Sequence, residues 1–355
     1  MGANRERLDV LLAAFGHLPY RLAVLAGRLV AGNPQLERWL SATRAAQRKP
    51  VIIVMIERLG DLIACSSIPR QLAEHDPSIA IAWVCSRRFS AVFLNNPYVD
   101  AVFDEESLAG WLLTKRRLSG SYDCRELFLD SQRCCWTGIR LPGRCSGVNH
   151  QNYLLTGANL LLSYSRAAGL SNICNVEPDL YVSSPAAPLP AELADRPLMA
   201  VHFYSEDPDR RISPDAAARF VNRAVARGWG VVEMGIRPIV PAGIAHVHFP
   251  GASLPLGGQL ALMRQVAHFV GVDSAFLHVA NAFRIPATLL LGKFRHFEAF
   301  ETFGGSFFHS AACTIFRDDV PMARVGSEAI AGLVPDLPDR IPIRKLDRVA
   351  DPEAA

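Results

Sequence analysis

The chain has 355 residues, more than a single hydrophobic core usually supports, so its length predicts two domains of roughly 150 residues each. Hydrophobic residues make up 50% and charged residues 20% of the chain, and this composition excludes a disordered protein. The formal net charge of +3 is small for such a length, so no nucleic-acid partner is expected.

The first part of the chain, residues 1–48, is predicted to be a separate helical extension. Residues 8–40 are rich in Leu and Ala, but charged residues interrupt the run too often for a membrane-spanning helix. Two amphipathic helices fit the pattern, with breaks at 17–19 and 32–34. Four arginines beside apolar positions suit an anionic inner-leaflet surface: Arg5, Arg7, Arg21 and Arg28. The alternative is packing on the first domain through the apolar side chains of Leu11, Leu12, Phe15, Leu22 and Leu25.

A first α/β domain is predicted over 49–185. Val51–Ile56 is a continuous apolar run of strand length, followed by the Gly60-Asp61 turn and a helix over 62–75. This order is typical of a doubly wound domain, whose ligands bind at the carboxyl ends of the strands. The fingerprint G-x-G-x-x-G is absent, so the turn is not predicted to bind a dinucleotide, and no cofactor is expected.

The spacing of the cysteines favours reduced thiols over a metal site. There are eight at irregular spacings in a chain without a convincing signal peptide, which predicts reduced thiols in a cytoplasmic protein. Four lie close together in the sequence: Cys124, Cys134, Cys135 and Cys145. None has C-x-x-C spacing, and the adjacent Cys134 and Cys135 would point apart, so incidental thiols are preferred to a zinc site.

A linker rich in Ser, Pro and Ala over 183–190 is the best domain boundary, and it leads into a second domain over 190–345. This domain repeats the order of strand, turn and helix, with strands at 198–203, 230–234 and 246–249 and a helix at 215–227. Two facing Rossmann-like domains are therefore predicted.

An acidic pair, Asp207 and Asp209, superficially resembles the D-x-D metal ligands of some glycosyltransferases. Pro208 between them and the neighbouring Glu206 indicate an exposed turn, whereas a metal requires both carboxylates to project to one point. No metal ligand is therefore predicted here.

The second domain also contains a strand, a turn, a helix and another strand in direct succession over 265–292. Val266–Val272 is apolar, Asp273 and Ser274 are good N-cap residues, and apolar spacing from Phe276 is helical. The first-turn N–H groups around Ser274 and Ala275 would be unpaired donors at the positive end of a helix dipole, which is a phosphate-binding arrangement.

Several ordered motifs resemble those of the bacterial ADP-heptose:lipopolysaccharide heptosyltransferases, glycosyltransferase family 9. In the first domain these are Gly60-Asp61, the N-P-x-V-D-x-V passage of 96–102, and the Y-D segment of 122–132 with Asp130 and Gln132. In the second domain they are the basic residue before Pro214 and the D-[ST]-G-x-x-H-x-A signature. The chain departs from the family pattern at Met55, Ser213, Ala275 and 292–294.

The resemblance implies a GT-B-like α/β fold and inverting, metal-independent transfer of heptose from ADP-heptose to a lipopolysaccharide inner-core acceptor. It implies that Asp61 is the general base, with Gly60 and Arg58 on the acceptor side. The donor-binding residues that it implies are Arg211, Asp273, Ser274, Ala275 and His278. The enzyme would work at the cytoplasmic face of the inner membrane, with peripheral contact at most.

Two alternatives keep the fold and change the function. One is a sugar-nucleotide transferase that acts on another surface glycan or on a protein, and the other is a GT-B-shaped binding protein without catalysis. The Gly60-Asp61 pair argues against the second alternative. The donor sugar, the acceptor, the linkage position and the oligomeric state do not follow from the sequence.

Overall fold

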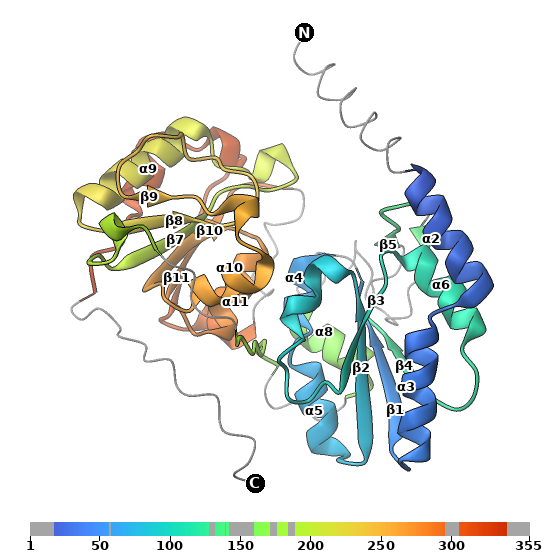
Figure 1. Ribbon diagram of the computed structural model, residues 1–355. Helices are drawn as coiled ribbons and strands as arrows, with labels where there is room; N and C mark the ends of the chain where they lie inside the picture. Colours follow the sequence, from blue (N-terminus) through green and yellow to red (C-terminus); the bar gives the residue numbers. More distant parts are fainter. Residues whose placement is uncertain are drawn as a thin grey trace.

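A computed structural model describes residues 18–56, 58–127, 132–138, 140–141, 160–170, 176–183, 189–294 and 305–338. These residues form two α/β domains, each built on a parallel sheet, as Figure 1 shows. The predicted fold class of two Rossmann-like domains is thereby confirmed. Within the described part of the chain, no helix is long and apolar enough to cross a membrane.

The first sheet has four parallel strands in the order β3-β2-β1-β4. They are β1 (Lys49–Val54), β2 (Ile79–Cys85), β3 (Ala101–Asp104) and β4 (Asp123–Glu126). Nearly every residue of β1 and β2 is buried, which explains why both read as continuous apolar runs instead of alternating ones. A separate antiparallel pair is formed by β5 (Gln132–Arg133) and β6 (Arg140–Leu141).

The single helix predicted over 62–75 is wrong, because the structure has two, α4 (Leu59–Ala64) and α5 (Ile68–His75). Pro69 lies in the first turn of α5, where its missing N–H is harmless, but inside one long helix it would remove a hydrogen bond. Ser66, between the two helices, accepts the N–H of Asp179 at 3.0 Å. The break therefore helps to fix the chain segment that leads to the second domain.

The N-terminal helices α2 (Leu18–Ala31) and α3 (Pro34–Ala45) are separated at the predicted break. On α3, Leu36 and Leu40 are completely buried and belong to the same hydrophobic cluster as β1 and β2 residues. The helix begins at Asn33, whose side chain accepts the N–H of Leu36 at 3.2 Å. Helix α3 is thus part of the core of the first domain.

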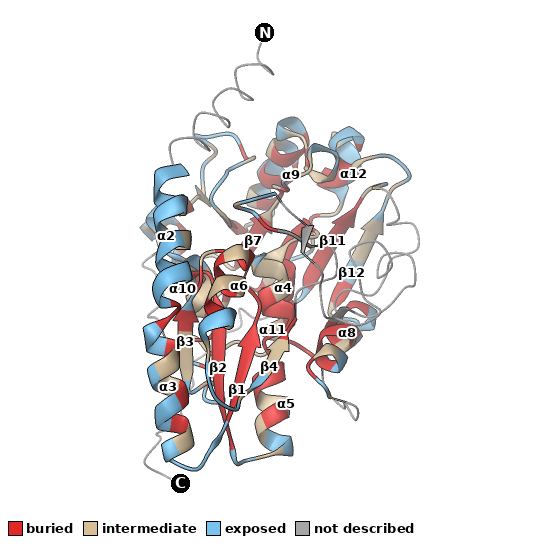
Figure 2. Ribbon diagram, turned by 90° about the vertical axis from the view of Figure 1, so that its right-hand side faces the viewer, coloured by how far each residue is buried: buried red, intermediate tan, exposed pale blue. Residues whose placement is uncertain are grey.

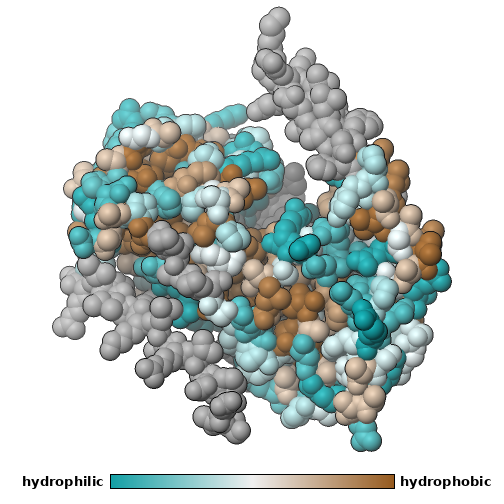
Figure 3. Space-filling model, viewed as in Figure 1, coloured by the Kyte–Doolittle hydropathy of each residue, from teal (hydrophilic) through white to brown (hydrophobic). Residues whose placement is uncertain are grey.

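Helix α2 is different, because none of its residues is buried (Figure 2). The packing alternative is wrong for Leu22, whose exposed fraction is 57%. Arg28, expected on a surface for anionic lipid, instead forms an ion pair with the buried Glu105 at 3.1 Å. Apolar side chains face solvent along this helix (Figure 3): Leu18, Tyr20, Leu22, Leu29 and Val30. The helix therefore turns a charge inward, whereas these five side chains face outward.

The second sheet has six parallel strands in the order β12-β11-β10-β7-β8-β9. They are β7 (Leu198–His202), β8 (Gly230–Glu233), β9 (Val247–His248), β10 (His268–Val272), β11 (Ala287–Leu291) and β12 (Cys313–Arg317). The strands predicted at 198–203, 230–234 and 246–249 are confirmed, with ends that differ by a residue or two. The sheet therefore has the parallel order that a doubly wound domain requires.

The remaining helices pack around the two sheets. They are α6 (Leu108–Arg117), α8 (Leu160–Ala167), α9 (Pro214–Ala226), α10 (Leu256–Met263), α11 (Ala275–Ala282) and α12 (Ser327–Gly332). A single hydrophobic cluster contains Leu62 of α4 and Leu277 of α11, so buried apolar residues are continuous between the domains. The segment around Asp130, which carries one of the family motifs, lies outside the described residues.

Candidate functional site

The strands β1 and β10 each lead into a short helix, and these helices, α4 and α11, are in contact across the domain boundary. A Cβ atom placed on Gly60 would lie 3.7 Å from the Cα atom of Ala275 and 3.8 Å from Cδ2 of His278. The structure thus brings together three of the predicted site residues, which come from two domains and lie more than two hundred positions apart in the sequence. Glycine at position 60 allows this close approach.

Arg58 is the N-cap of α4, and its backbone has φ 71° and ψ 102°. A positive φ is unusual for a residue with a side chain and costs of the order of 1–3 kcal/mol, so the surrounding structure holds this turn in place. Its side chain is exposed and its positive charge acts on Asp61. Met55, which stands where the family has a basic residue, is only 1% exposed, so Arg58 supplies a positive charge to this turn.

Asp61 lies in the first turn of α4, after the N-cap residue Arg58. The hydroxyl of Tyr164 donates a hydrogen bond of 2.9 Å to Oδ1 of Asp61. Burial raises the pKa of Asp61, with Asp273 acting in the same direction, whereas Arg58 and Tyr164 lower it. The net result is a raised pKa, which makes this carboxylate a better base than a solvated aspartate.

Tyr164 was not predicted as a site residue. It lies on α8 and is 1% exposed, and its hydroxyl reaches the carboxylate from a different part of the first domain. A tyrosine in a sequence segment without a motif gives no signal of such a role. Its identification requires the packing of α8 against α4, which the structure shows.

The N-terminus of α11 carries polar side chains without protein partners. Ser274 is the N-cap, with φ −159° and ψ 169°, but its side chain makes no capping hydrogen bond. Within the described residues, Oγ of Ser274 and Nδ1 of His278 are buried and have no hydrogen-bond partner. Buried polar atoms are usually paired, so these two indicate a missing ligand or water. We call Ser274, Ala275 and His278 the Ser274 site.

His278 is 4% exposed, and burial lowers its pKa from the ordinary value of 6.5, although Asp273 and Glu177 act in the opposite direction. The imidazole is therefore neutral at pH 7 and can donate or accept one hydrogen bond at each nitrogen, according to its tautomer. A neutral donor close to a helix N-terminus suits the oxygen of a phosphate group.

Asp273 lies beside the Ser274 site and is paired with a basic residue. Arg210 forms an ion pair with its carboxylate and donates a hydrogen bond of 2.7 Å to its carbonyl oxygen. The guanidinium carbon of Arg210 is also 5.4 Å from the ring centroid of Phe294. These residues, with Gly292, line a small open pocket at the ends of β10 and β11.

Arg211, the arginine predicted to bind the donor, has other contacts. Its Nε donates to the carbonyl of Ser205, and its Nη2 donates to the carbonyl of Glu206 at 3.1 Å. Its guanidinium carbon lies 4.5 Å from the ring centroid of Tyr204. Of the two consecutive arginines, Arg210 is thus the one in contact with Asp273, and the donor-binding role of Arg211 stays a prediction.

The acidic pair Asp207 and Asp209 forms part of a short 3-10 helix, in which the Asp207 side chain accepts the N–H of Asp209 at 3.1 Å. Asp209 is exposed, so the predicted exposed turn is confirmed. Cys134 is buried and Cys135 is exposed, whereas Cys145 lies outside the described residues. In the described part of the chain, no three His, Cys, Asp or Glu side chains are placed to hold a metal ion.

No protein-family model and no curated protein matches the chain. Solved structures do match. The glycosyl transferase family 9 from Veillonella parvula DSM 2008 is 16% identical, with 76% of this chain and 86% of that chain covered and a TM-score of 0.56. E. coli ADP-heptose lps heptosyltransferase II is 15% identical, with 80% and 96% covered and a TM-score of 0.55.

A third similar structure is E. coli heptosyltransferase WaaC with ADP, which is 12% identical, with 80% of this chain and 98% of that chain covered and a TM-score of 0.56. Likeness at such low identity concerns the fold, and the chain has the GT-B-like two-domain fold of these proteins. The resemblance predicted from the sequence motifs is therefore confirmed at the level of the fold.

Proposed function

We propose that the protein is a glycosyltransferase whose active site lies between α4 and α11. The observation that carries this proposal is the direct approach of Gly60 to Ala275 and His278, which places a carboxylate of raised pKa opposite a helix N-terminus with unpaired polar groups. Sugar transfer needs both features, because a base must take the proton of the acceptor hydroxyl and the leaving diphosphate must be stabilised.

Asp61 is the proposed general base. Its carboxylate takes the proton from an acceptor hydroxyl as the oxygen attacks the anomeric carbon of the donor sugar, and the bond to the diphosphate breaks. Attack on the face opposite the leaving group inverts the configuration at that carbon. Gly60 and Arg58 complete the acceptor side, and the Tyr164 hydroxyl holds Asp61 in one orientation.

The proposed donor diphosphate binds at the Ser274 site. N–H groups of the first turn of α11, the Ser274 hydroxyl and the His278 ring provide donors, and Asp273 holds Arg210 beside them. Arg211, the basic residue expected from the sequence, adjoins Arg210 on the same loop. These groups of the protein stabilise the negative charge of the leaving diphosphate. We therefore propose that the transfer needs no divalent metal.

The proposed reaction is the transfer of heptose from ADP-heptose to a lipopolysaccharide inner-core acceptor. It is supported by the sequence motifs around Gly60-Asp61 and Asp273-Ser274, and by the likeness in fold to E. coli heptosyltransferases, one of which was solved with ADP. A transferase that acts on another surface glycan or on a protein would use the same residues in the same roles.

Contact with a membrane is proposed through α2. The apolar side chains of this helix face solvent, whereas Arg28 is engaged with Glu105. An acceptor anchored in a membrane would be easier to reach for an enzyme held at that surface. The proposed location is therefore the cytoplasm, with peripheral contact at the inner membrane.

The test uses the full chain with ADP-heptose and a heptose-free core glycan, and it measures release of ADP. Asp61→Asn is expected to reduce turnover by about 10²–10⁴-fold while ADP still binds. Asp195→Asn, which changes an exposed aspartate elsewhere, serves as the matched control and is expected to have wild-type turnover. Turnover of Asp61→Asn within a few-fold of the wild type would remove the catalytic role. If the wild-type protein binds ADP but produces no ADP from ADP-heptose, this result would support the binding-protein alternative.

A further inference from the structure

The segment that precedes the predicted linker, residues 176–183, is bound to the first domain near the proposed base. The N–H of Asp179 donates to the Ser66 hydroxyl at 3.0 Å, and the Asp179 carboxylate forms an ion pair with Arg70 at 2.7 Å. Ser66 follows α4, the helix that carries Asp61, and Arg70 lies on α5. This segment is therefore fixed to the end of α4 and the start of α5.

Glu177 of the same segment is bound to the second domain instead. It is 5% exposed, and its Oε2 accepts Nδ2 of Asn281 at 2.7 Å. Its Oε1 accepts the N–H of Ser306 at 2.7 Å and the Ser306 hydroxyl at 2.6 Å. Asn281 lies on α11, and Ser306 lies on the 3-10 helix Gly305–His309. One short segment thus joins the helix of the proposed base to the helix of the proposed donor site.

The second domain provides a site for this carboxylate. Gly305 has φ 60°, which residues with side chains rarely adopt, and a Cβ atom there would lie 2.7 Å from Oε1 of Glu177. A side chain at position 305 would therefore displace the carboxylate. Burial of a charged group costs free energy unless hydrogen bonds satisfy it, and the second domain supplies three donors here.

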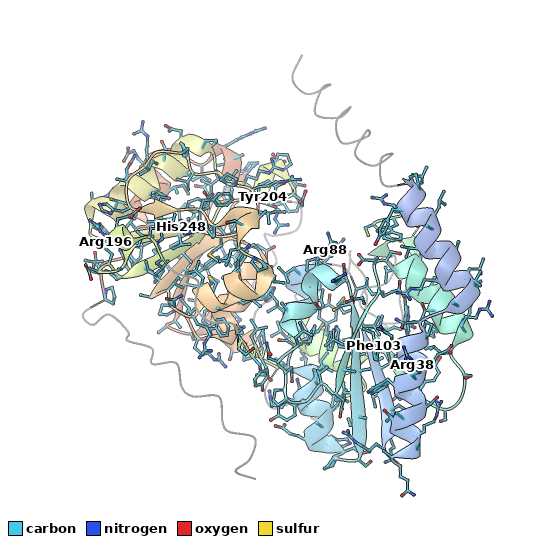
Figure 4. The ribbon with its side chains drawn as sticks, in the orientation of Figure 1. Arg38, Arg88, Phe103, Arg196, Tyr204 and His248 are labelled. Carbon is cyan, nitrogen blue, oxygen red and sulfur yellow. The ribbon has the colours of Figure 1, made fainter. Side chains whose placement is uncertain are left out.

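Glu177 also acts on the Ser274 site. Burial lowers the pKa of His278, and the charges of Asp273 and Glu177 oppose this effect. In Figure 4 the side chains of the two domains meet below the labelled Tyr204, at the level of α4 and α11, and these helices are in contact. A change in the Glu177 contact would therefore move α11 relative to α4, and with it the two halves of the proposed active site.

We propose that Glu177 is a positioning residue, which holds α11 at the distance from α4 that sugar transfer requires. This rests on the proposed function. Asp61 and the Ser274 site lie on different domains, so neither domain alone fixes the distance between the base and the leaving diphosphate. Misplacement by about 1 Å costs about 100-fold in rate, whereas the groups that bind the diphosphate all belong to the second domain. Loss of the Glu177 contact therefore reduces turnover and leaves ADP affinity unchanged.

The first measurement compares turnover and ADP affinity of full-chain variants. Glu177→Gln turns one of the two acceptor oxygens into a donor, so turnover should fall at least tenfold while the dissociation constant of ADP stays within twofold of the wild type. Asn281→Asp in the same chain supplies an acceptor for that donor. The double variant should therefore turn over at least fivefold faster than Glu177→Gln, since the two substitutions act on one contact.

Glu126→Gln is the matched control. Glu126 is 6% exposed, and its Oε1 accepts Nε1 of Trp111 at 2.7 Å, so it is as buried as Glu177, but this bond lies within the first domain. The control should lower the melting temperature and leave the turnover of the folded protein unchanged.

The second measurement is amide hydrogen exchange of the full chain without ligand, which needs no turnover. Glu177→Gln should increase exchange in α11 of the second domain and also in α4 and α5 of the first, because the 176–183 segment then holds neither helix against the other. Glu126→Gln should increase exchange in the first domain only.

Three results would overturn the proposal. Wild-type turnover of Glu177→Gln, with a melting temperature lowered as in Glu126→Gln, would show that Glu177 serves stability alone. ADP affinity lowered at least tenfold with unchanged turnover would make Glu177 part of the donor site. Increased exchange in α11 without any change in α4 and α5 would show that the segment does not connect the domains. A wild type without turnover would refute the proposed function, and the exchange measurement would still decide whether Glu177 positions α11.

Discussion

The two helix N-termini at the domain boundary have the same local origin and different chemistry. Both α4 and α11 follow a buried parallel strand, and both were predicted from a short polar turn after an apolar run. At α4 the turn contains Arg58 with a positive φ and holds an aspartate that is hydrogen-bonded by Tyr164. At α11 the first turn is uncharged, and Ser274 and His278 have buried polar atoms without protein partners in the described residues.

This difference separates two tasks. A carboxylate that already has a hydrogen-bond donor is held in one orientation, as a general base must be. Donors at a helix N-terminus that the protein leaves unpaired can pair with an anion, as a binding site for a leaving group requires. The same secondary-structure motif thus positions a base in the first domain and forms an anion site in the second domain.

Apart from loss of the base itself, the largest effect is expected from separating the two helices. Gly60→Leu places a branched side chain where a Cβ alone already lies 3.7 Å from Ala275, so the domains must move apart. Turnover should fall by about 100-fold or more, because misplacement by about 1 Å has that effect. Gly60→Ala, at ordinary contact distance, should retain most activity. Gly332→Leu, where nothing lies within 4 Å, is the control, and equal turnover of both leucine variants would refute the direct approach of α4 to α11.

The second prediction concerns Asp61 and pH. The pKa of Asp61 in the folded protein is raised above the ordinary value of 3.8. The contribution of Asp61 to stability is therefore fully present below pH 3.8 and is lost as the pH rises through the folded-state pKa. Asp61→Asn removes this loss. Its melting temperature relative to the wild type should therefore increase as the pH rises from acid to neutral, which differential scanning calorimetry can measure.

Tyr164→Phe should act on the same carboxylate. Since the Tyr164 hydroxyl lowers the pKa of Asp61, its removal should shift the acidic limb of the rate profile to higher pH, with activity recovering at alkaline pH. A melting-temperature difference between Asp61→Asn and wild type that does not change with pH, or an unshifted rate profile of Tyr164→Phe, would contradict the assigned environment.

Two N-cap serines allow a direct comparison in which the expected effects are smaller. Ser107 accepts the N–H of Gly110 at 3.1 Å and caps α6, whereas Ser274 makes no capping bond. Ser107→Ala should lower the free energy of unfolding by about 1 kcal/mol and leave ADP affinity unchanged. Ser274→Ala should leave stability almost unchanged and weaken ADP binding about fivefold, the equivalent of about 1 kcal/mol. Chelator should not alter either affinity. If Ser274→Ala lowers stability alone, its hydroxyl serves the fold.

The smallest effect is expected at the membrane. Leu29→Glu and Val30→Glu change side chains with exposed fractions of 56% and 73%, so stability and turnover on a soluble acceptor should not change. Co-sedimentation with anionic phospholipid vesicles should become weaker in both. Ile236→Glu, 70% exposed on the second domain, is the control. Equal vesicle binding by all variants would exclude α2 as the contact.

Deletion of residues 1–45 is instead expected to give insoluble protein, because it removes the buried Leu36 and Leu40.

The sequence by itself determined the repeated strands and the two turns of the candidate site. A short continuous apolar run such as Val51–Ile56, followed by a glycine-containing turn, favours a strand covered on both faces. Asp273-Ser274 before helical spacing indicates a helix start. These signals are local, so they can be read without knowing the fold. The same is true of the break at residues 32–34, because glycine and proline restrict the backbone directly.

Tertiary structure alone decided which side chains meet. The hydroxyl of Tyr164 at Asp61, Arg210 instead of Arg211 at Asp273, and the pairing of Arg28 with Glu105 join residues whose separation in the sequence carries no information about distance. Helical spacing predicted amphipathic helices over the first residues but could not say which face is covered, since the partner of a helix face is another part of the chain. The structure buries one side of α3 against the first sheet, whereas α2 packs on α6 and leaves several apolar side chains in solvent.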